Sequence, residues 1–223
     1  MFEIRERRSK SLTDKCLVLD LDETLVHTQT DFDYELFEEI IFSDPKFYHL
    51  RSRCYKITMD DVVHKKGTGD KTEMWGICRP YLQDFLKDCF KYFKLVIIWS
   101  AGRKNYVHRI VDYIFRDLPR PDYIFTYDDL EKLPDNTFIK PLSKIWKIAP
   151  EMTPDNSLIV DDRKEVFEPN KDNGIQIKKY HPVFTLEGLQ EDDSELIKLR
   201  NWLFSKEVIN CENVRKLDKT KIF

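Results

Sequence analysis

The sequence lacks the features that mark several large classes of protein. Its five cysteines are odd in number, lie far apart and contain no C-x-x-C pair, so neither a disulfide framework nor a zinc knuckle is expected. No apolar run approaches the roughly 20 residues that a membrane-spanning helix needs, and the N-terminus has no apolar stretch typical of a signal peptide. We therefore expect an intracellular protein, nuclear or cytoplasmic, with no membrane partner.

An excess of basic charge is also missing. The chain has 37 Lys and Arg against 40 Asp and Glu, which gives a formal net charge of -3 at pH 7. A dedicated nucleic-acid-binding domain carries a clearly basic face, so nucleic acid is not an expected partner. A hydrophobic content of 41%, a charged content of 35% and a mean hydropathy of -0.53 are typical of a globular domain. The 223 residues predict one domain that carries an insertion.

Short apolar runs alternate with amphipathic segments along most of the chain. This alternation is typical of a parallel sheet covered by helices, and it predicts an α/β fold of the doubly wound class. Asp192 and Ser194 are candidate caps of the last predicted helix. The expected strands are residues 16–21, 93–99, 122–126, 137–140, 157–162 and 173–177, and the expected helices are 79–90, 104–116, 143–149 and the segment that contains Leu196, Leu199 and Leu203.

The alternation breaks at about residues 26–77. Two strand-like runs on either side of a Gly-containing turn at residues 66–70 predict a β-hairpin, so we interpret this stretch as a small β-rich insertion between the first two core strands. Its aromatic residues either line a peptide-binding wall or pack the insertion on the core; they are Phe32, Tyr34, Phe37 and Trp75. The expected organisation is an N-terminal arm at 1–14, the domain at 15–206 and a C-terminal tail at 207–223.

Two carboxylates, Asp20 and Asp22, stand where the first predicted strand leaves the sheet. In extended backbone the two side chains point to the same side, and their mutual repulsion is relieved by a cation. Open α/β sheets bind ligands at this carboxyl edge. The pair alone fits solvated acids at a strand end as well as it fits a cation site.

Polar residues follow other predicted strands in the same way. Ser100 precedes a glycine and a helix, Lys140 follows Phe138 and Ile139, and Asp161 and Asp162 end the strand near residue 160. A hydroxyl, an ammonium and two pairs of carboxylates at one sheet edge suit a phosphate group together with Mg²⁺, which prefers oxygen ligands. The sequence therefore predicts a phosphate and magnesium site.

The motifs resemble those of the haloacid dehalogenase superfamily phosphatases that carry D-x-D-x-T. The similarity is to the branch of the RNA polymerase II C-terminal-domain (CTD) phosphatases and the small CTD phosphatases, also described as NLI-interacting-factor-like. The matching segments are Asp20-Leu-Asp22-Glu-Thr24-Leu-Val-His, Arg79-Pro, Trp99-Ser100-Ala-Gly, Ile139-Lys140-Pro-Leu-Ser and Ile159-Val-Asp161-Asp162-Arg163, in the family's order between about residues 15 and 181.

The resemblance implies a role for each matching residue. Asp20 is the expected nucleophile, which becomes an aspartyl phosphate, and Asp22 the expected general acid and base, with Thr24 orienting their turn. Ser100 is expected to hold a phosphoryl oxygen and Lys140 to neutralise charge. The implied cofactor is Mg²⁺, held by Asp20, the backbone carbonyl of Asp22 and Asp162, with Asp161 adjacent. The small CTD phosphatases usually carry an arginine shortly before their third motif, and residues 126–132 contain none.

Three functions follow as hypotheses. The first is a Mg²⁺-dependent phosphoserine and phosphothreonine protein phosphatase, because a short insertion without a helical lid leaves the site open to a macromolecular substrate such as a CTD-like phosphoprotein. The second is the same chemistry on a nucleic-acid end or a small phosphate ester, which the basic residues near the termini favour weakly. The third is a binding module without activity, although such a module has no physical need for the complete set of polar residues. The sequence does not indicate an oligomeric state.

Overall fold

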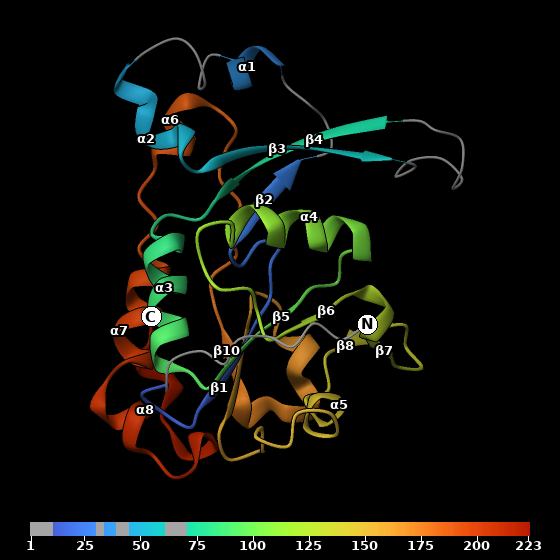
Figure 1. Cartoon of the computed structure of the whole chain (residues 1–223), viewed down its shortest axis with the longest axis vertical. Coiled ribbons are helices and arrows are strands. Elements are labelled where there is room, and N and C mark those ends of the chain that lie inside the picture. The colour runs from blue at the N-terminus through green and yellow to red at the C-terminus, as the bar shows by residue number, and fades with distance from the viewer. Residues whose placement is uncertain (1–10, 30–33, 39–44, 61–70) are drawn as a thin grey trace.

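The computed structural model describes residues 11–29, 34–38, 45–60 and 71–223 (Figure 1). Its strands are β1 Cys16–Leu19, β2 Val26–Gln29, β3 Cys54–Asp60, β4 Lys71–Cys78, β5 Leu95–Trp99, β6 Tyr123–Phe125, β7 Glu131–Lys132, β8 Phe138–Ile139, β9 Ser157–Asp161 and β10 Gly174–Gln176. Its α-helices are α1 Tyr34–Glu38, α2 Tyr48–Arg51, α3 Leu82–Tyr92, α4 Lys104–Ile114, α5 Ser143–Trp146, α6 Leu186–Gln190, α7 Glu195–Leu203 and α8 Lys206–Asn210. The 3₁₀ segments are η2 Pro45–Phe47, η3 Tyr127–Asp129, η4 Lys164–Asn173, η5 Val214–Lys216 and η6 Lys219–Lys221.

The central sheet has the strand order β10-β9-β1-β5-β6, and its strands pair in parallel. From β1 the chain builds outward to β5 and β6 on one side, and later to β9 and β10 on the other. This reversal puts the end of β1 at the topological switch point, where open α/β sheets bind ligands. The predicted doubly wound α/β class is confirmed.

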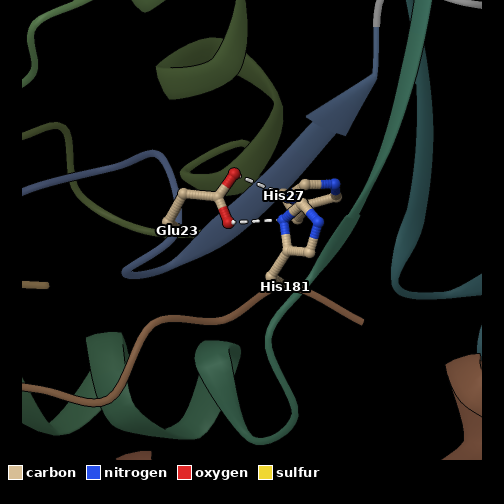
Figure 2. Close-up of side chains that lie close together, drawn as sticks. All are labelled: Glu23, His27 and His181. Atoms are coloured by element: carbon tan, nitrogen blue, oxygen red, sulfur yellow. Dashed lines mark hydrogen bonds and ion pairs between the residues drawn. The ribbon is translucent and has the colours of Figure 1, made fainter. Parts of the chain in front are cut away.

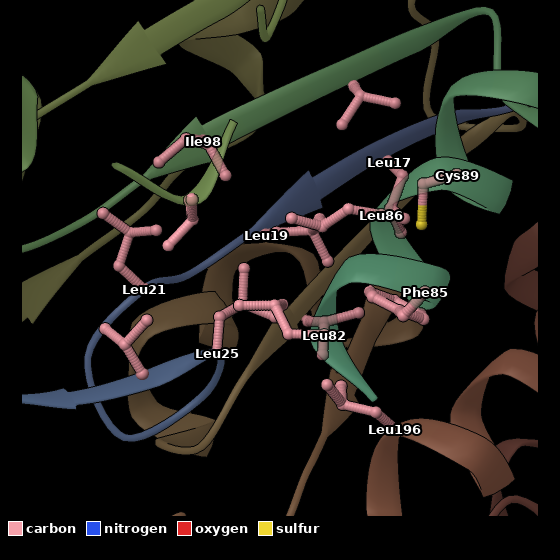
Figure 3. Close-up of a cluster of buried hydrophobic side chains, with 14 of the residues drawn as sticks. Leu17, Leu19, Leu21, Leu25, Leu82, Phe85, Leu86, Cys89, Ile98 and Leu196 are labelled. Atoms are coloured by element: carbon pink, nitrogen blue, oxygen red, sulfur yellow. The ribbon is translucent and has the colours of Figure 1, made fainter. Parts of the chain in front are cut away.

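Alternation along the strands divides the core between two faces of the sheet. Leu17 and Leu19 pack with α3, α4 and α7 in the main cluster shown in Figure 3, whereas Cys16 and Val18 pack with α5 and η4 on the other face. All four side chains are fully buried. Such apolar runs are typical of parallel strands covered by helices on both faces.

The predicted β-rich insertion forms an antiparallel sheet of order β2-β4-β3, which Figure 1 shows beyond α4 from the central sheet. β3 and β4 are the arms of the expected hairpin, and the turn predicted at residues 66–70 lies outside the described residues. Trp75 is fully buried among apolar side chains, so it packs the insertion and does not line an open wall. Phe32 and the side chains of Tyr34 and Phe37 lie outside the described residues.

Two local predictions are corrected. The strand predicted at 137–140 shortens to β8, which pairs with β7 in a separate two-stranded sheet. The cap of α7 is the Asp193 carboxylate, which accepts a hydrogen bond from Glu195 N at 3.1 Å, whereas the Ser194 side chain makes no capping bond. The Asp193 carboxylate thus satisfies one of the free N–H groups of the first turn, which a side chain at the N-cap commonly does.

Near the C-terminus, Val208, Val214 and Ile222 are buried in the main core cluster. The division into arm, domain and tail stays a prediction. Within the described residues no helix is long and apolar enough to cross a membrane.

Candidate active site

The site is built at the end of β1, where the chain turns into the insertion. Asp20 N still donates to Val160 O at 3.0 Å as part of the sheet, and Leu25 N then donates to Leu21 O at 2.8 Å to close a turn. Within this turn Glu23 has a φ of 63°, a left-handed conformation that costs energy in any residue with a Cβ. A cleft of about 350 Å³ opens beside the turn, lined by Asp20, Asp22, Glu23, Ala101, Gly102, Asp162, Arg163 and Lys179.

Lys140 lies fully buried beneath this cleft, between two carboxylates. Its Nζ atom is 2.6 Å from Asp20 Oδ1 and 2.6 Å from Asp161 Oδ2. Burial acts to lower the pKa of Lys140, but the charges of Asp161 and Asp20 outweigh it and the pKa is raised. Lys140 therefore stays charged and fixes the orientation of the Asp20 carboxylate.

Asp22 is held by two hydroxyl groups. Ser100 Oγ donates to Asp22 Oδ2 at 3.1 Å, and Tyr106 OH donates to Asp22 Oδ1. Ser100 is itself buried, and its Oγ accepts a hydrogen bond from Gly102 N at 2.9 Å. At this strand end Ala101 and Gly102, and not the Ser100 hydroxyl, line the cleft.

Tyr106, in the first turn of α4, is a residue of the site that the sequence did not single out. The phenol begins a chain of hydroxyl groups, because Thr28 Oγ1 lies 2.6 Å from Tyr106 OH and 2.6 Å from Tyr55 OH. This chain joins α4 to the insertion sheet. Helical periodicity shows which face of a helix is covered but not which polar group on another element a phenol reaches. The only signal for Tyr106 was its place near the start of the helix that follows Ser100.

The two acids at the end of β9, Asp161 and Asp162, lie in different surroundings. Asp161 is fully buried, and both of its oxygens are used, one by Lys140 and the other by Arg163 N at 3.0 Å. Asp162 lies at the cleft, and its N–H donates to Thr24 Oγ1 at 3.2 Å. Thr24 therefore ties the turn after β1 to the end of β9.

The electrostatics of the site call for a cation. Burial and the nearby Asp161 charge raise the pKa of Asp20 to about 8. Burial raises the pKa of Asp22 against the hydrogen bonds from Tyr106 and Ser100, and it raises that of Asp162 to about 6. Four carboxylates lie around the buried ammonium of Lys140, and a divalent ion would favour their charged forms.

The donor set fits Mg²⁺. Carboxylate oxygens of Asp20, Asp161 and Asp162 all lie within 4.8 Å of one another, and hard oxygen ligands suit Mg²⁺. Because Asp161 already binds Lys140 and Arg163 N, and Asp20 Oδ1 binds Lys140, the carboxylate oxygens of this cluster left for a metal ion are Asp20 Oδ2 and those of Asp162.

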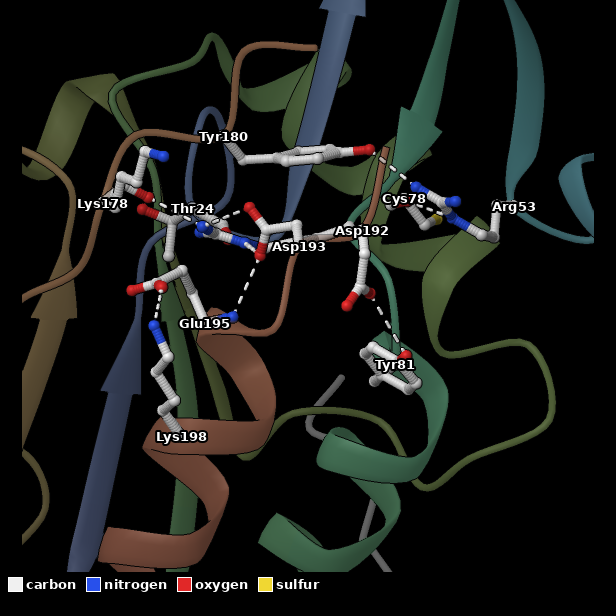
Figure 4. A network of polar contacts seen from close by, with 11 residues as sticks. Thr24, Arg53, Cys78, Tyr81, Lys178, Tyr180, Asp192, Asp193, Glu195 and Lys198 are labelled. Atoms are coloured by element: carbon white, nitrogen blue, oxygen red, sulfur yellow. Dashed lines mark hydrogen bonds and ion pairs between the residues drawn. The ribbon is translucent and has the colours of Figure 1, made fainter. Parts of the chain in front are cut away.

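Arg79 supports the turn from behind. Its buried guanidinium donates to Thr24 O at 3.1 Å, to Lys178 O at 2.9 Å and to the Asp193 carboxylate at 2.8 and 2.9 Å. The partners Thr24, Lys178 and Asp193 lie side by side in Figure 4. These contacts give Arg79 a structural role, since they bind the turn after β1 to the segment before α7.

Comparison with known proteins identifies the family. A family model described as NLI interacting factor-like phosphatase matches residues 15–215. The chain belongs to this family. A CTD phosphatase-like protein of Invertebrate iridescent virus 6 is 33% identical over 138 residues, which cover 57% of this chain and 73% of the viral protein. CTD small phosphatase-like protein 2 of Dictyostelium discoideum is 29% identical over 209 residues, which cover 93% of this chain but 30% of that protein.

Solved structures agree with the fold. The fission yeast RNA polymerase II CTD phosphatase Fcp1, bound to beryllium fluoride, superposes with a TM-score of 0.59 at 19% identity, over 85% of this chain and 51% of that one. The chain thus spans about half the length of this relative and 39% of a ubiquitin-like domain-containing CTD phosphatase of Arabidopsis thaliana. The resemblance found in the sequence is confirmed, and membership of a phosphatase family supports phosphatase activity.

Proposed function

We propose that the chain is a Mg²⁺-dependent phosphoserine and phosphothreonine protein phosphatase that works through an aspartyl phosphate. The observation that carries this proposal is the arrangement around Asp20: a buried carboxylate oriented by Lys140 at 2.6 Å, beside a second carboxylate, Asp22, held by two hydroxyl groups. One carboxylate is fixed for attack and the other for proton transfer. Family membership supports the same reading.

In the first step an oxygen of the Asp20 carboxylate attacks phosphorus. The bond from phosphorus to the serine or threonine oxygen breaks, and protonated Asp22 gives its proton to that leaving oxygen. In the second step the Asp22 carboxylate takes a proton from water, whose oxygen attacks the phosphorus. The bond to Asp20 then breaks, phosphate leaves, and both side chains return to their starting states.

The remaining groups act through charge and position. Phosphoryl transfer is accelerated mainly by positioning and by stabilising charge. Lys140 holds the Asp20 oxygen that does not attack, and Ala101 and Gly102 line the part of the cleft where phosphoryl oxygens would lie. Mg²⁺, held by Asp20, Asp162 and the Asp22 carbonyl, would neutralise the phosphate and orient it for attack in line.

The form of the cleft supports a protein substrate. The cleft has a volume of about 350 Å³ and opens at the surface. Lys179 and Arg163 line it together with the carboxylates. An open cleft of this size admits a phosphorylated side chain on a polypeptide. Nuclear or cytoplasmic phosphoproteins with CTD-like segments are the proposed partners, since several relatives are named as CTD phosphatases.

Hydrolysis of a generic aryl phosphate at mildly acidic pH, with Mg²⁺ and with EDTA, tests the chemistry. We expect metal-dependent activity that Asp20→Asn abolishes and that Asp117→Asn preserves, because the Asp117 side chain is 81% exposed and bonds to its neighbour Arg116. Asp20→Asn that is folded and keeps more than a few per cent of the activity would contradict the aspartyl phosphate. A folded wild type without any activity would favour a binding module.

A substrate panel then tests specificity. Phosphoserine and phosphothreonine peptides are compared with 5′- and 3′-phosphorylated oligonucleotides at equal concentration. We expect higher kcat/KM on the peptides; the reverse order would transfer the same chemistry to nucleic-acid ends. Beryllium fluoride, which binds the fission yeast relative, provides a readout without turnover: its binding, followed by fluorine NMR, is expected in the wild type and not in Asp20→Asn.

A further inference from the structure

A second cluster of metal-ligating side chains lies next to the proposed active site. Glu23 belongs to the turn after β1, His27 to β2 and His181 to the segment between β10 and α6. His27 Nδ1 is 2.7 Å from Glu23 Oε1, and His181 Nδ1 is 3.2 Å from Glu23 Oε2. Figure 2 shows both imidazoles turned toward the one carboxylate.

The donor atoms have the spacing of a metal site. One ligand atom from each of the three residues lies within 4.8 Å of the other two. With zinc-to-nitrogen bonds of about 2.0–2.1 Å, ligands in a tetrahedral shell are about 3.3 Å apart, so small shifts would bring these atoms to bonding distance. Without a cation, each contact between an imidazole Nδ1 and a carboxylate oxygen of Glu23 needs a proton on the nitrogen. A metal ion can take the place of both protons.

The cluster is held in place by its surroundings. His27 is 4% exposed, and its ring packs edge-on against His181 and beside Phe184, with centroids 4.4 and 5.2 Å apart. Tyr180 N donates to Glu23 O at 2.6 Å, which fixes the two chain segments together. The left-handed φ of Glu23, 63°, costs energy that these contacts offset. The His181 side chain is 62% exposed and gives an ion a path from solvent.

We propose that Glu23, His27 and His181 form a second cation site, which takes a first-row transition-metal ion such as Zn²⁺ with water completing its shell. Two imidazoles and a carboxylate are donors that such ions prefer, whereas Mg²⁺ prefers an all-oxygen shell. The two sites are therefore chemically distinct although Glu23 follows Asp22 directly in the chain. The proposal does not depend on the proposed function.

The charge of Lys179 provides an electrostatic test of the proposed cation site. Its ammonium lies 3.9 Å from Glu23 Oε2, on a side chain that is 58% exposed. A cation bound to Glu23 repels this ammonium at short range. Lys179→Ala therefore strengthens zinc binding, whereas His181→Ala removes a ligand and weakens it.

Zinc binding is measured directly, by competition with a chromophoric chelator under saturating Mg²⁺ that fills the oxygen site. The full chain is used with Cys211→Ser, which removes the one cysteine that is not buried. We expect one Zn²⁺ per chain and no change in affinity with His49→Ala, an exposed histidine outside the cluster. His181→Ala and Glu23→Gln should each lower the affinity by at least the about 10- to 100-fold that the loss of an outer-shell partner costs. Co²⁺ in place of Zn²⁺ is expected to give a visible absorption band that His181→Ala abolishes.

Two results would overturn the proposal. One is the absence of a bound Zn²⁺ in the folded wild type. The other is binding that His181→Ala and Glu23→Gln leave unchanged while Asp162→Ala removes it, which would place the ion at the proposed active site. Because His181 is exposed, His181→Ala is expected to fold, and its unfolding temperature without metal confirms this before titration.

Discussion

The phenol of Tyr106 gives the sharpest test of how the site is oriented. Its hydroxyl donates to Asp22 Oδ1, and since a phenol has one proton, it must accept from Thr28 Oγ1, 2.6 Å away, which in turn accepts from Tyr55 OH. A chain of three hydroxyls thus ends on the proposed general acid. Tyr106→Phe removes the last link with little change in shape.

The size of the effect follows from the charge on Asp22. A hydrogen bond to a charged group contributes about 1.5–3 kcal/mol, and about 1.4 kcal/mol corresponds to a tenfold change in rate. We therefore expect kcat/KM to fall by about 10- to 100-fold if the bond acts in the transition state. The same bond lowers the pKa of Asp22 against the raising effect of burial, so its loss raises that pKa.

A pH profile of aryl phosphate hydrolysis measures both effects. Asp22 must be protonated to act as the acid, so its ionisation causes the loss of activity at high pH, and a higher pKa moves this alkaline limb of the Tyr106→Phe profile to higher pH. Tyr55→Phe serves as the matched control, because Tyr55 reaches Asp22 only through two other hydroxyls. A folded Tyr106→Phe within about twofold of the wild type, with the same alkaline limb, would refute the reasoning.

Three further predictions concern the metal, the pH dependence of stability and the support of the turn. Asp162→Ala is expected to raise the Mg²⁺ concentration needed for half-maximal activity, and an unchanged titration would remove Asp162 from the ligand set. In EDTA, the free energy of unfolding should decrease as the pH rises from about 4 to about 8. The pKa of Asp20 is raised from 3.8 to about 8 in the folded chain, which therefore holds this proton more tightly than the unfolded chain does. Denaturant unfolding that shows the same dependence on pH in Asp20→Asn would contradict this. Asp193→Ala leaves the buried Arg79 guanidinium without its carboxylate and should lower the free energy of unfolding by about 3–5 kcal/mol, measured in urea, and a loss near zero would show that the pair does not secure the turn.

The sequence by itself determined the class of fold and most of the proposed site. Short continuous apolar runs such as Cys16–Leu19 are typical of strands that are buried on both faces. Their alternation with amphipathic helices predicts a parallel sheet. Parallel strands bring their carboxyl ends to one edge of the sheet. The sequence therefore predicts that polar residues directly after the strands, including Asp20, Ser100 and Asp162, lie close together.

Only the tertiary structure decided which groups touch. Lys140, directly after β8, lies between Asp20 and Asp161, and its backbone N–H donates to Val166 O in η4, so its position depends on how η4 packs. Tyr106 reaches Asp22 because α4 packs between two sheets. His181 meets Glu23 across 158 positions of the chain. Local patterns record the period of burial along one element, whereas these contacts depend on the relative placement of several elements, which is fixed by packing of the whole core.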